Sequence, residues 1–307
     1  MKTIVLPESY DKRVIKAARI IVKRKIAKVI LIRTDRPLSV QDNENLDILD
    51  IGFSLQFKDD YKKLKSGKEN ETRKDDPVKE LNDPLIFALM LLKNNFADVA
   101  IAGSVYSTAN VLRNAIKIIG TSEGNKTVSS FFLFRFPPRH RFHGKVFAYA
   151  DCGVIPAPDY RQLSDIALMT ARNYRKLTGR KPRVAFLSFS TKGSASHESV
   201  DIVIKAYRLT RKRRPDLICD GELQFDAAFV PDVAKIKNPG GLIKGDANVF
   251  IFPDLNSANI AYKITERIGG AFATGPIVQG LAKPVMDLSR GCSADDIVRM
   301  AEISIKL

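Results

Sequence analysis

The N-terminal part of the chain alternates between two short apolar runs and a longer amphipathic run. Thr3–Leu6 has the composition of a buried strand, Asp11–Lys23 places its apolar residues on one side of a helix, and Val29–Ile32 is a second apolar run. A strand, a helix and a strand at this spacing are typical of a right-handed crossover in a parallel sheet. The start of the chain therefore predicts an α/β fold.

The same alternation continues along the rest of the chain, whose 307 residues are enough for two α/β domains. Ligands of such sheets bind beyond the carboxyl ends of the strands, so we expect the loops after strands to carry the functional residues. Between Thr34 and Asp76 the pattern is weaker, and the polar run Lys65–Asn70 predicts a flexible loop or lid. The other expected strands are Ala97–Ala102, Thr127–Phe136, Val146–Ala150, Arg183–Ser188, Val249–Phe252 and Pro284–Leu288, and the other expected helices are Asp83–Asn94, Thr108–Ile118, Ser164–Leu177 with Ser164 as its N-cap, and one that starts near Glu198.

The formal net charge of +16 raises the question of a polyanionic partner. The basic runs are dispersed along the chain, and no zinc finger or aromatic-rich platform for single strands accompanies them. Several of them lie on predicted helices whose other faces are apolar. We therefore interpret the charge as solvated helix faces and expect no nucleic-acid partner.

The remaining composition indicates a cytoplasmic protein. No apolar run approaches the roughly 20 residues of a membrane helix, and the first residues lack the apolar core and cleavage site of a signal peptide. The three cysteines are widely separated and form no disulfide framework or zinc pattern. The three histidines form no metal-ligand spacing with them, so no metal site is predicted.

The stretch from Pro284 to Val298 combines a short apolar strand, the loop Ser289-Arg290-Gly291 and the start of a helix with Ser293 as its N-cap. A hydroxyl, a guanidinium and free backbone N–H groups then surround one point, which suits an anion. A cation at a helix N-terminus opposes the helix dipole, so Arg290 is better explained if it shares an anion. Asp296 has two interpretations, as a general base or as the partner of Ser293 in a capping box.

A second polar loop, Phe189–Ser196, follows a predicted strand and is rich in hydroxyls. It lacks the spacing of a P-loop. Ser190 and Thr191 either help to hold a phosphate or belong to an ordinary polar loop before the next helix, and the spacing does not separate the two.

Several long segments, in order, resemble the phosphate acetyltransferase (phosphotransacetylase) branch of the phosphate acetyl/butyryltransferase family. The similarity covers nearly the whole chain and is strongest from about Arg183 onward. The matching segments are Ile4–Glu8, Asp11–Ala18, Thr108–Arg113, Ile118–Thr121, Val128–Ser130, Val184–Ala195, Asp220–Ala227, Asn248–Asn259 and Gly275–Ile297.

This resemblance implies two α/β domains with largely parallel sheets, like those of isocitrate and isopropylmalate dehydrogenases, and an active site in the interdomain cleft. The first domain would comprise residues 1–125 and 278–307, and the inserted second domain residues 126–277. The implied reaction is the reversible transfer of an acetyl group between acetyl phosphate and coenzyme A, without metal or a tightly bound cofactor. Its ligands would be coenzyme A or acetyl-CoA, acetyl phosphate and inorganic phosphate, and the family implies a homodimer.

The resemblance also implies roles for individual residues. Asp296 matches the proposed base that takes the thiol proton of coenzyme A, Ser289 matches a residue that positions the thiol, and Arg290 matches the cation on the phosphoryl or acyl oxygens. A thiol with a pKa near about 8.5 needs help to ionise, and an aspartate of pKa about 3.9 is a feeble base. Electrostatic stabilisation by Arg290 is therefore expected to be the larger effect.

Five further residues are expected to bind substrate: Arg113, Arg267, Lys65, Ser190 and Thr191. Lys65 marks a departure from the family, whose loop usually reads Leu-Arg-Lys-His-Lys-Gly where this chain reads Leu-Lys-Ser-Gly-Lys from Leu64. A lysine lacks the bidentate fork of an arginine, so this change bears on coenzyme A affinity.

Two alternatives stay open. A phosphate butyryltransferase would have the same fold and mechanism with a larger acyl pocket. A non-catalytic acetyl-CoA sensor would keep the fold without turnover, although the presence of Ser289, Arg290 and Asp296 argues against it.

Overall fold

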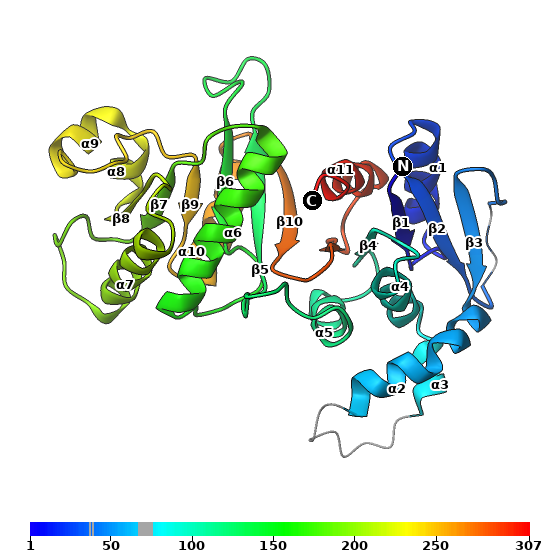
Figure 1. Ribbon diagram of the computed structural model, residues 1–307. Coiled ribbons are helices and arrows are strands. Elements are labelled where there is room, and N and C mark those ends of the chain that lie inside the picture. The colour runs from blue at the N-terminus through cyan, green and yellow to red at the C-terminus, as the bar shows by residue number, and fades with distance from the viewer. Residues whose placement is uncertain (37, 39, 67–75) are drawn as a thin grey trace. The chain divides into compact units, whose positions relative to one another are not determined.

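The computed structural model describes residues 1–36, 38, 40–66 and 76–307 (Figure 1). The chain forms two compact units, one of Met1–Gly124 with Leu281–Leu307 and the other of Asn125–Gly280. The second unit is thus inserted into the first. Residues 67–70 of the predicted lid lie outside the described residues.

The first unit contains a five-stranded sheet in the order β11-β4-β1-β2-β3, and all its pairings are parallel. From β1 the chain builds outward to β2 and β3, and then returns to place β4 on the other side of β1. The strand order therefore reverses between β1 and β4, and such a reversal opens a crevice at the carboxyl ends of the two strands. The elements are β1 (Thr3–Leu6), α1 (Lys12–Lys23), β2 (Lys28–Arg33), β3 (Leu46–Asp50), the 3₁₀ helix η1 (Ile51–Phe57), α2 (Lys58–Ser66), α3 (Pro77–Leu81), α4 (Pro84–Lys93), β4 (Val99–Ala102), α5 (Thr108–Ile118), β11 (Val285–Asp287) and α11 (Ala294–Ser304).

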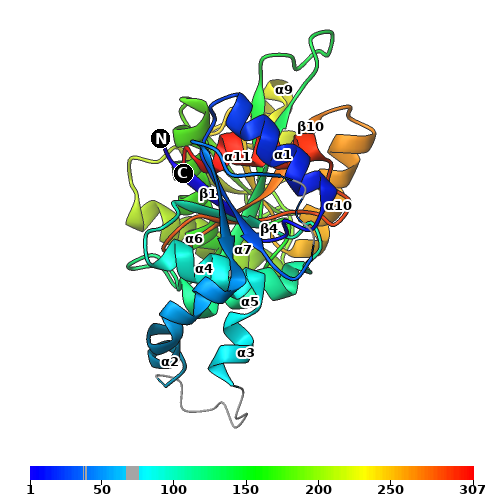
Figure 2. The ribbon, with the colours of Figure 1, turned by 90° about the vertical axis from the view of Figure 1, so that its right-hand side faces the viewer.

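Helices cover both faces of this sheet. Helix α1 packs against α11 on one face, and α4 packs against α5 on the other (Figures 1 and 2). Every residue from Leu85 to Leu92 of α4 is buried, because η1, α5 and the sheet surround that helix. A helix that is apolar all round is stable only when it is enclosed in this way.

The second unit contains a six-stranded sheet in the order β10-β5-β6-β9-β7-β8. Strands β6, β9, β7 and β8 run parallel, whereas β5 is antiparallel to both β6 and β10. Both sheets are thus largely parallel, which confirms the predicted fold class. The elements are β5 (Ser129–Arg135), β6 (Val146–Ala150), α6 (Tyr160–Thr178), β7 (Val184–Leu187), α7 (Glu198–Arg213), β8 (Cys219–Leu223), α8 (Phe225–Phe229), α9 (Pro231–Lys237), β9 (Val249–Ile251), α10 (Leu255–Arg267) and β10 (Phe272–Gln279).

The chain passes between the two units twice. Within each unit, the outgoing and the returning segments are hydrogen-bonded to each other. In the first unit the N–H of Ala282 donates to the carbonyl of Gly120 at 3.0 Å. In the second unit the side-chain amide of Asn125 donates to the carbonyl of Gly280 at 3.1 Å. The beginning and the end of the inserted segment therefore lie next to each other.

The predicted N-cap Ser164 is wrong. Helix α6 begins at Tyr160, and Asp159 caps it by accepting from the N–H groups of Arg161 and Gln162 while the Gln162 side chain accepts from the N–H of Asp159. Ser164 lies inside the helix, where its buried hydroxyl accepts from Thr210 at 2.9 Å. An acidic capping box one turn earlier satisfies more free N–H groups than a lone serine.

None of the described helices combines the length and the apolar character that crossing a membrane requires.

Candidate active site

Glu8 follows β1, where the strand order of the first sheet reverses, and fixes the loop that follows β4. Its side chain is 1% exposed. One carboxylate oxygen accepts from the N–H of Ser104 at 2.9 Å and from its hydroxyl at 2.7 Å, and the other accepts from the N–H groups of Val105 and Tyr106, both at 2.7 Å. Four donors on one buried carboxylate form a strong charge-assisted set. The loop before α5 is thus held against the end of β1.

Arg13, on α1, joins this loop to the loop after β11. Its guanidinium donates to the carbonyl of Ser104 at 2.9 Å, and to the carbonyls of Arg290 and Cys292 at 2.7 and 2.9 Å. Asp11 orients the guanidinium through a 2.6 Å ion pair. Sequence reasoning gave Glu8 and Arg13 no role, because their partners are distant in the sequence and follow only from the strand order.

The loop after β11 exposes two side chains that the sequence assigns to the candidate site. Ser289 and Arg290 are both exposed, and the Ser289 hydroxyl accepts from the N–H of Gly291 at 3.2 Å. Within the described part of the chain, the Arg290 guanidinium has no hydrogen bond or ion pair. The structure places Ser289 and Arg290 in the loop before α11, and the expected convergence of their side chains with free backbone N–H groups on an anion stays a prediction.

Asp296 is a helix-capping residue in this structure. Its carboxylate accepts from the N–H of Ser293 at 2.8 Å, the Ser293 hydroxyl accepts from the N–H of Asp296, and Arg299 pairs with its other oxygen. Burial alone would raise the pKa of Asp296, but these hydrogen bonds and the ion pair outweigh it and lower the pKa below its ordinary value. The capping-box interpretation is confirmed, and the role of Asp296 as a base stays a prediction.

Cys292 lies between the two ends of this loop and is buried. Burial raises the pKa of its thiol, although the nearby Arg13 opposes the shift. A thiol with a raised pKa is a poor nucleophile, and the burial of Cys292 agrees with the packing role expected from the sequence.

Asp287, at the end of β11, is a buried carboxyl group that sequence reasoning did not single out. One of its oxygens accepts from the hydroxyl of Thr108 at 2.6 Å, and the other has no hydrogen-bond partner among the described residues. A Cβ at Gly103 (φ +105°) would lie 2.5 Å from that second oxygen, so only glycine permits this approach of β4 to β11. Burial, opposed by Thr108 and reinforced by the Glu8 carboxylate, raises the pKa of Asp287 to about 6.

We expect Asp287→Asn to stabilise the protein more at pH 8 than at pH 5. The folded pKa of about 6 lies above the ordinary 3.8, so stability from this group is lost as the pH rises from about 4 to about 6. Above that range the ionised carboxylate destabilises the fold by up to about 3 kcal/mol, which asparagine avoids. Thermal unfolding of both proteins at the two pH values measures the effect. An equal difference in Tm at pH 5 and pH 8 would contradict it.

Two predicted substrate-binding residues of the first unit lie in different settings. Arg113 is exposed on α5. Lys65 is half-buried at the end of α2, where its ammonium group lies 2.7 Å from a carboxylate oxygen of Glu80. Tyr61 donates to the other oxygen of Glu80. The Lys65 side chain is therefore engaged within its own unit.

The loop after β7 carries Ser190 and Thr191 in the second unit, and both are buried. The Ser190 hydroxyl donates to Glu222 at 3.0 Å, and the same carboxylate oxygen accepts from the N–H of Gly193 at 2.7 Å. The Thr191 hydroxyl accepts from the N–H of Gln224 at 2.9 Å. Both hydroxyls hold the loop to the end of β8, and the loop exposes Phe189 before them and Lys192 after them.

Arg267 lies in the last turn of α10, also in the second unit, and its side chain is 81% exposed. Its only charged neighbour among the described residues is Glu266, at 3.6 Å. The guanidinium is thus available to a ligand. No group of three potential metal ligands occurs within the ranges that the structure describes.

Comparisons with known proteins give a consistent result. Residues 1–305 match the model of a family described as phosphate acetyl/butaryl transferase. A phosphate acetyltransferase of Acetivibrio thermocellus is 48% identical over 309 residues, which cover 99% of this chain and 93% of that protein. A solved phosphotransacetylase from Streptococcus pyogenes matches with a TM-score of 0.90 at 38% identity and covers 99% of this chain and 93% of its own.

A more distant match bears on the fold alone. 4-Hydroxythreonine-4-phosphate dehydrogenase from Klebsiella pneumoniae matches with a TM-score of 0.52 at 10% identity, over 99% of each chain. This likeness agrees with the predicted dehydrogenase-like architecture.

Proposed function

The chain belongs to the phosphate acetyl/butaryl transferase family, and from this premise we propose that it is a phosphate acetyltransferase. It transfers an acetyl group reversibly between acetyl phosphate and coenzyme A, which acts as a substrate. The observation that carries this assignment is 48% identity to a phosphate acetyltransferase over nearly the whole chain. Acetyl phosphate, inorganic phosphate and coenzyme A are all anions, and the net charge of +16 suits them.

In the direction of acetyl-CoA synthesis, the thiol loses its proton and its sulfur attacks the carbonyl carbon. A sulfur–carbon bond forms while the carbon–oxygen bond to phosphate breaks, and the phosphate leaves with the electron pair. We assign stabilisation of the developing oxyanion and of the phosphate to Arg290, whose guanidinium is exposed and unpaired within the described residues. Preorganised charge of this kind is usually the largest single contribution to catalysis.

Ser289 is assigned to positioning the thiol, and Asp296 to accepting its proton. The lowered pKa of Asp296 makes it a weak base while it caps α11. Release of Ser293 or Arg299 on substrate binding would raise that pKa and strengthen the base. Roles in substrate binding for Arg113, Arg267, Lys65, Ser190 and Thr191 remain part of the proposal, and the exposed guanidinium of Arg267 supports its assignment.

The direct test is formation of the thioester from acetyl phosphate and coenzyme A by the purified protein, followed by its absorbance. We expect kcat/KM for acetyl phosphate to exceed that for butyryl phosphate. The reverse order would make the protein a butyryltransferase. Binding of acetyl-CoA without turnover of either donor would identify a sensor and overturn the proposal.

We further propose that the protein is a cytoplasmic homodimer whose copies meet through β10 and α10. Strand β10 is an edge strand, which can pair with another chain. Large apolar side chains are exposed from α10 to the start of β10, and an unpartnered apolar surface of this kind marks an interface. They are Ile260, Ile264, Ile268 and Phe272, exposed by 59%, 51%, 83% and 65%. The three cysteines are free, as is usual in the reducing cytoplasm.

Replacing Ile264 and Ile268 together by lysine should dissociate the dimer. Charges in the centre of an apolar interface are expected to weaken association by about 30-fold or more. Light scattering across a concentration series measures the mass. Ile236→Lys, at an apolar side chain that is 82% exposed on α9, is the matched control and should leave the mass unchanged. A double variant that stays dimeric places the interface elsewhere.

A further inference from the structure

A cavity of about 520 Å³ lies at the amino ends of β6 and β9 in the second unit. Val146, the first residue of β6, lines it, and so does Asn248, which directly precedes β9. The cavity therefore lies at the amino ends of the parallel strands, whereas the Ser190–Thr191 loop follows the carboxyl end of β7. Its volume falls within the range of about 300–1,000 Å³ that is typical of small-molecule sites. None of the residues assigned to the proposed reaction lines this cavity.

The charged side chains around the cavity are mostly cations. Arg141, Lys145 and Arg180 line it, and all three are exposed. Arg180 donates to the carbonyl of Gly144 at 2.7 Å, whereas Arg141 and Lys145 contact only the ring of Phe142, at 4.5 and 5.8 Å, among the described residues. None of the three cations makes an ion pair within those ranges.

The only carboxylate among the described lining residues is Asp246, and it is already neutralised. One of its oxygens forms an ion pair with Nε of Arg183, at 2.8 Å. Within the described residues that nitrogen makes no hydrogen bond, so the contact is purely electrostatic. The amide of Asn248 is also engaged, since it accepts from the N–H of Arg183 and donates to the carbonyl of Lys181. The unsatisfied charge of the cavity is therefore positive and suits an anion.

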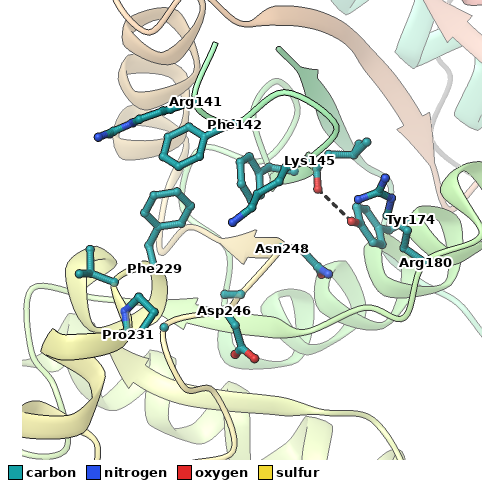
Figure 3. Close-up of a pocket in the computed structure, with 14 residues that line it drawn as sticks. Arg141, Phe142, Lys145, Tyr174, Arg180, Phe229, Pro231, Asp246 and Asn248 are labelled. Carbon is teal, nitrogen blue, oxygen red and sulfur yellow. Dashed lines mark hydrogen bonds between the residues drawn. The ribbon is translucent and has the colours of Figure 1, made fainter. Parts of the chain in front are cut away.

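The other walls are aromatic. Phe142, Phe147 and Phe229 pack edge to face, with ring centroids 5.2 to 6.1 Å apart, and Phe142 and Phe229 are only half-buried. Tyr174 lies across the cavity from this pair of rings (Figure 3), where its hydroxyl donates to the carbonyl of Val146 at 2.9 Å. Rings fixed by one another present a rigid surface on which a flat heterocycle can stack.

We propose that this cavity binds a nucleotide, with its base against the Phe142–Phe229 wall and its phosphates among Arg141, Lys145 and Arg180. A ligand selected by this cavity must carry both a flat ring and a phosphate. The cations alone would hold any small anion, and the aromatic rings alone would hold any flat molecule. Free nucleotides have this chemistry, and so does the nucleotide half of coenzyme A. The site is independent of the reaction at Arg290 and does not rest on the proposed function.

The test is equilibrium dialysis of the full-length protein against ADP, adenosine, pyrophosphate and coenzyme A. The double variant Arg141→Gln, Lys145→Gln is compared with Lys205→Gln, Lys212→Gln, which removes the same charge from exposed positions on α7. We expect wild type to bind ADP at least about tenfold more tightly than adenosine or pyrophosphate, since stacking of one base contributes about 1–3 kcal/mol. The cavity variant should lose at least about tenfold in ADP affinity, and the control variant none.

Dialysis against coenzyme A distinguishes the two possible ligands, a free nucleotide and the nucleotide half of coenzyme A. A second equivalent of coenzyme A that disappears only in the cavity variant would make the substrate itself the occupant, whereas loss of ADP binding alone would indicate a free nucleotide. ADP binding that persists in the cavity variant, or falls equally in both variants, would overturn the proposal. So would failure of wild type to bind ADP at millimolar concentration.

Discussion

Replacing Arg290 by alanine should lower kcat about 100- to 1,000-fold while the fold stays intact. Loss of one preorganised donor at a developing oxyanion typically costs about 3–4 kcal/mol of transition-state stabilisation. The fold should survive because the structural contact of this residue is made by its backbone carbonyl, which accepts from Arg13 and remains in the alanine variant. Steady-state turnover and thermal unfolding of the same preparation measure the two quantities.

Two companion variants sharpen this result. Arg290→Lys keeps the charge without the bidentate fork, so we expect kcat between those of wild type and the alanine variant. Ser293→Ala perturbs the start of the same helix without removing a charge, and it should cost about 1 kcal/mol of stability. Because it removes a side-chain hydrogen bond that lowers the pKa of Asp296, it should not reduce kcat as the alanine variant at position 290 does. An alanine variant at position 290 with unchanged kcat would remove Arg290 from the mechanism.

Replacing Glu8 by alanine should lower the free energy of unfolding by about 4 kcal/mol. The change leaves the Ser104 hydroxyl and three backbone N–H groups without their acceptor, and each unsatisfied buried donor costs about 1–3 kcal/mol. The N–H of Val105, on an exposed residue, is expected to contribute least. Urea unfolding at pH 7 gives the difference.

Glu8→Gln is the matched control, because it has the same shape and keeps one oxygen acceptor. The NH2 group of the glutamine cannot accept from the donors that face it, so we expect roughly half the loss of stability seen with alanine. A loss of less than about 1 kcal/mol for the alanine variant would mean that water replaces the carboxylate, and that Glu8 does not fix the loop.

Local signals in the sequence located much of the candidate site. The strand before Ser289, the loop that carries Arg290 and the cap at Ser293 follow from patterns within a few residues of one another, and the structure has the same order. The part that the sequence does not reveal is non-local. Glu8 and Arg13 acquire their partners only because β4 returns to the side of β1, which no short pattern specifies.

Competing local signals explain the wrong cap of α6 and the strand that the sequence did not indicate. Ser164 looked like a cap because it precedes an apolar run, yet Asp159 and Gln162 together offer the chain a better one. Strand β10 received no assignment because Gly275 and Pro276 interrupt it. An edge strand tolerates a proline, and the register shift between Thr274 and Ile277 accommodates it. Asp296 shows the limit of spacing arguments, since one separation fits both a cap and a base.

The hydrogen bonds Ala282–Gly120 and Asn125–Gly280 bear on how the inserted segment could be removed or exchanged. Because both ends of the inserted segment meet at one place, a short bridging peptide could close the gap that its removal leaves. Recombination at that single place could exchange the whole segment for another module, and a circularly permuted gene could begin there.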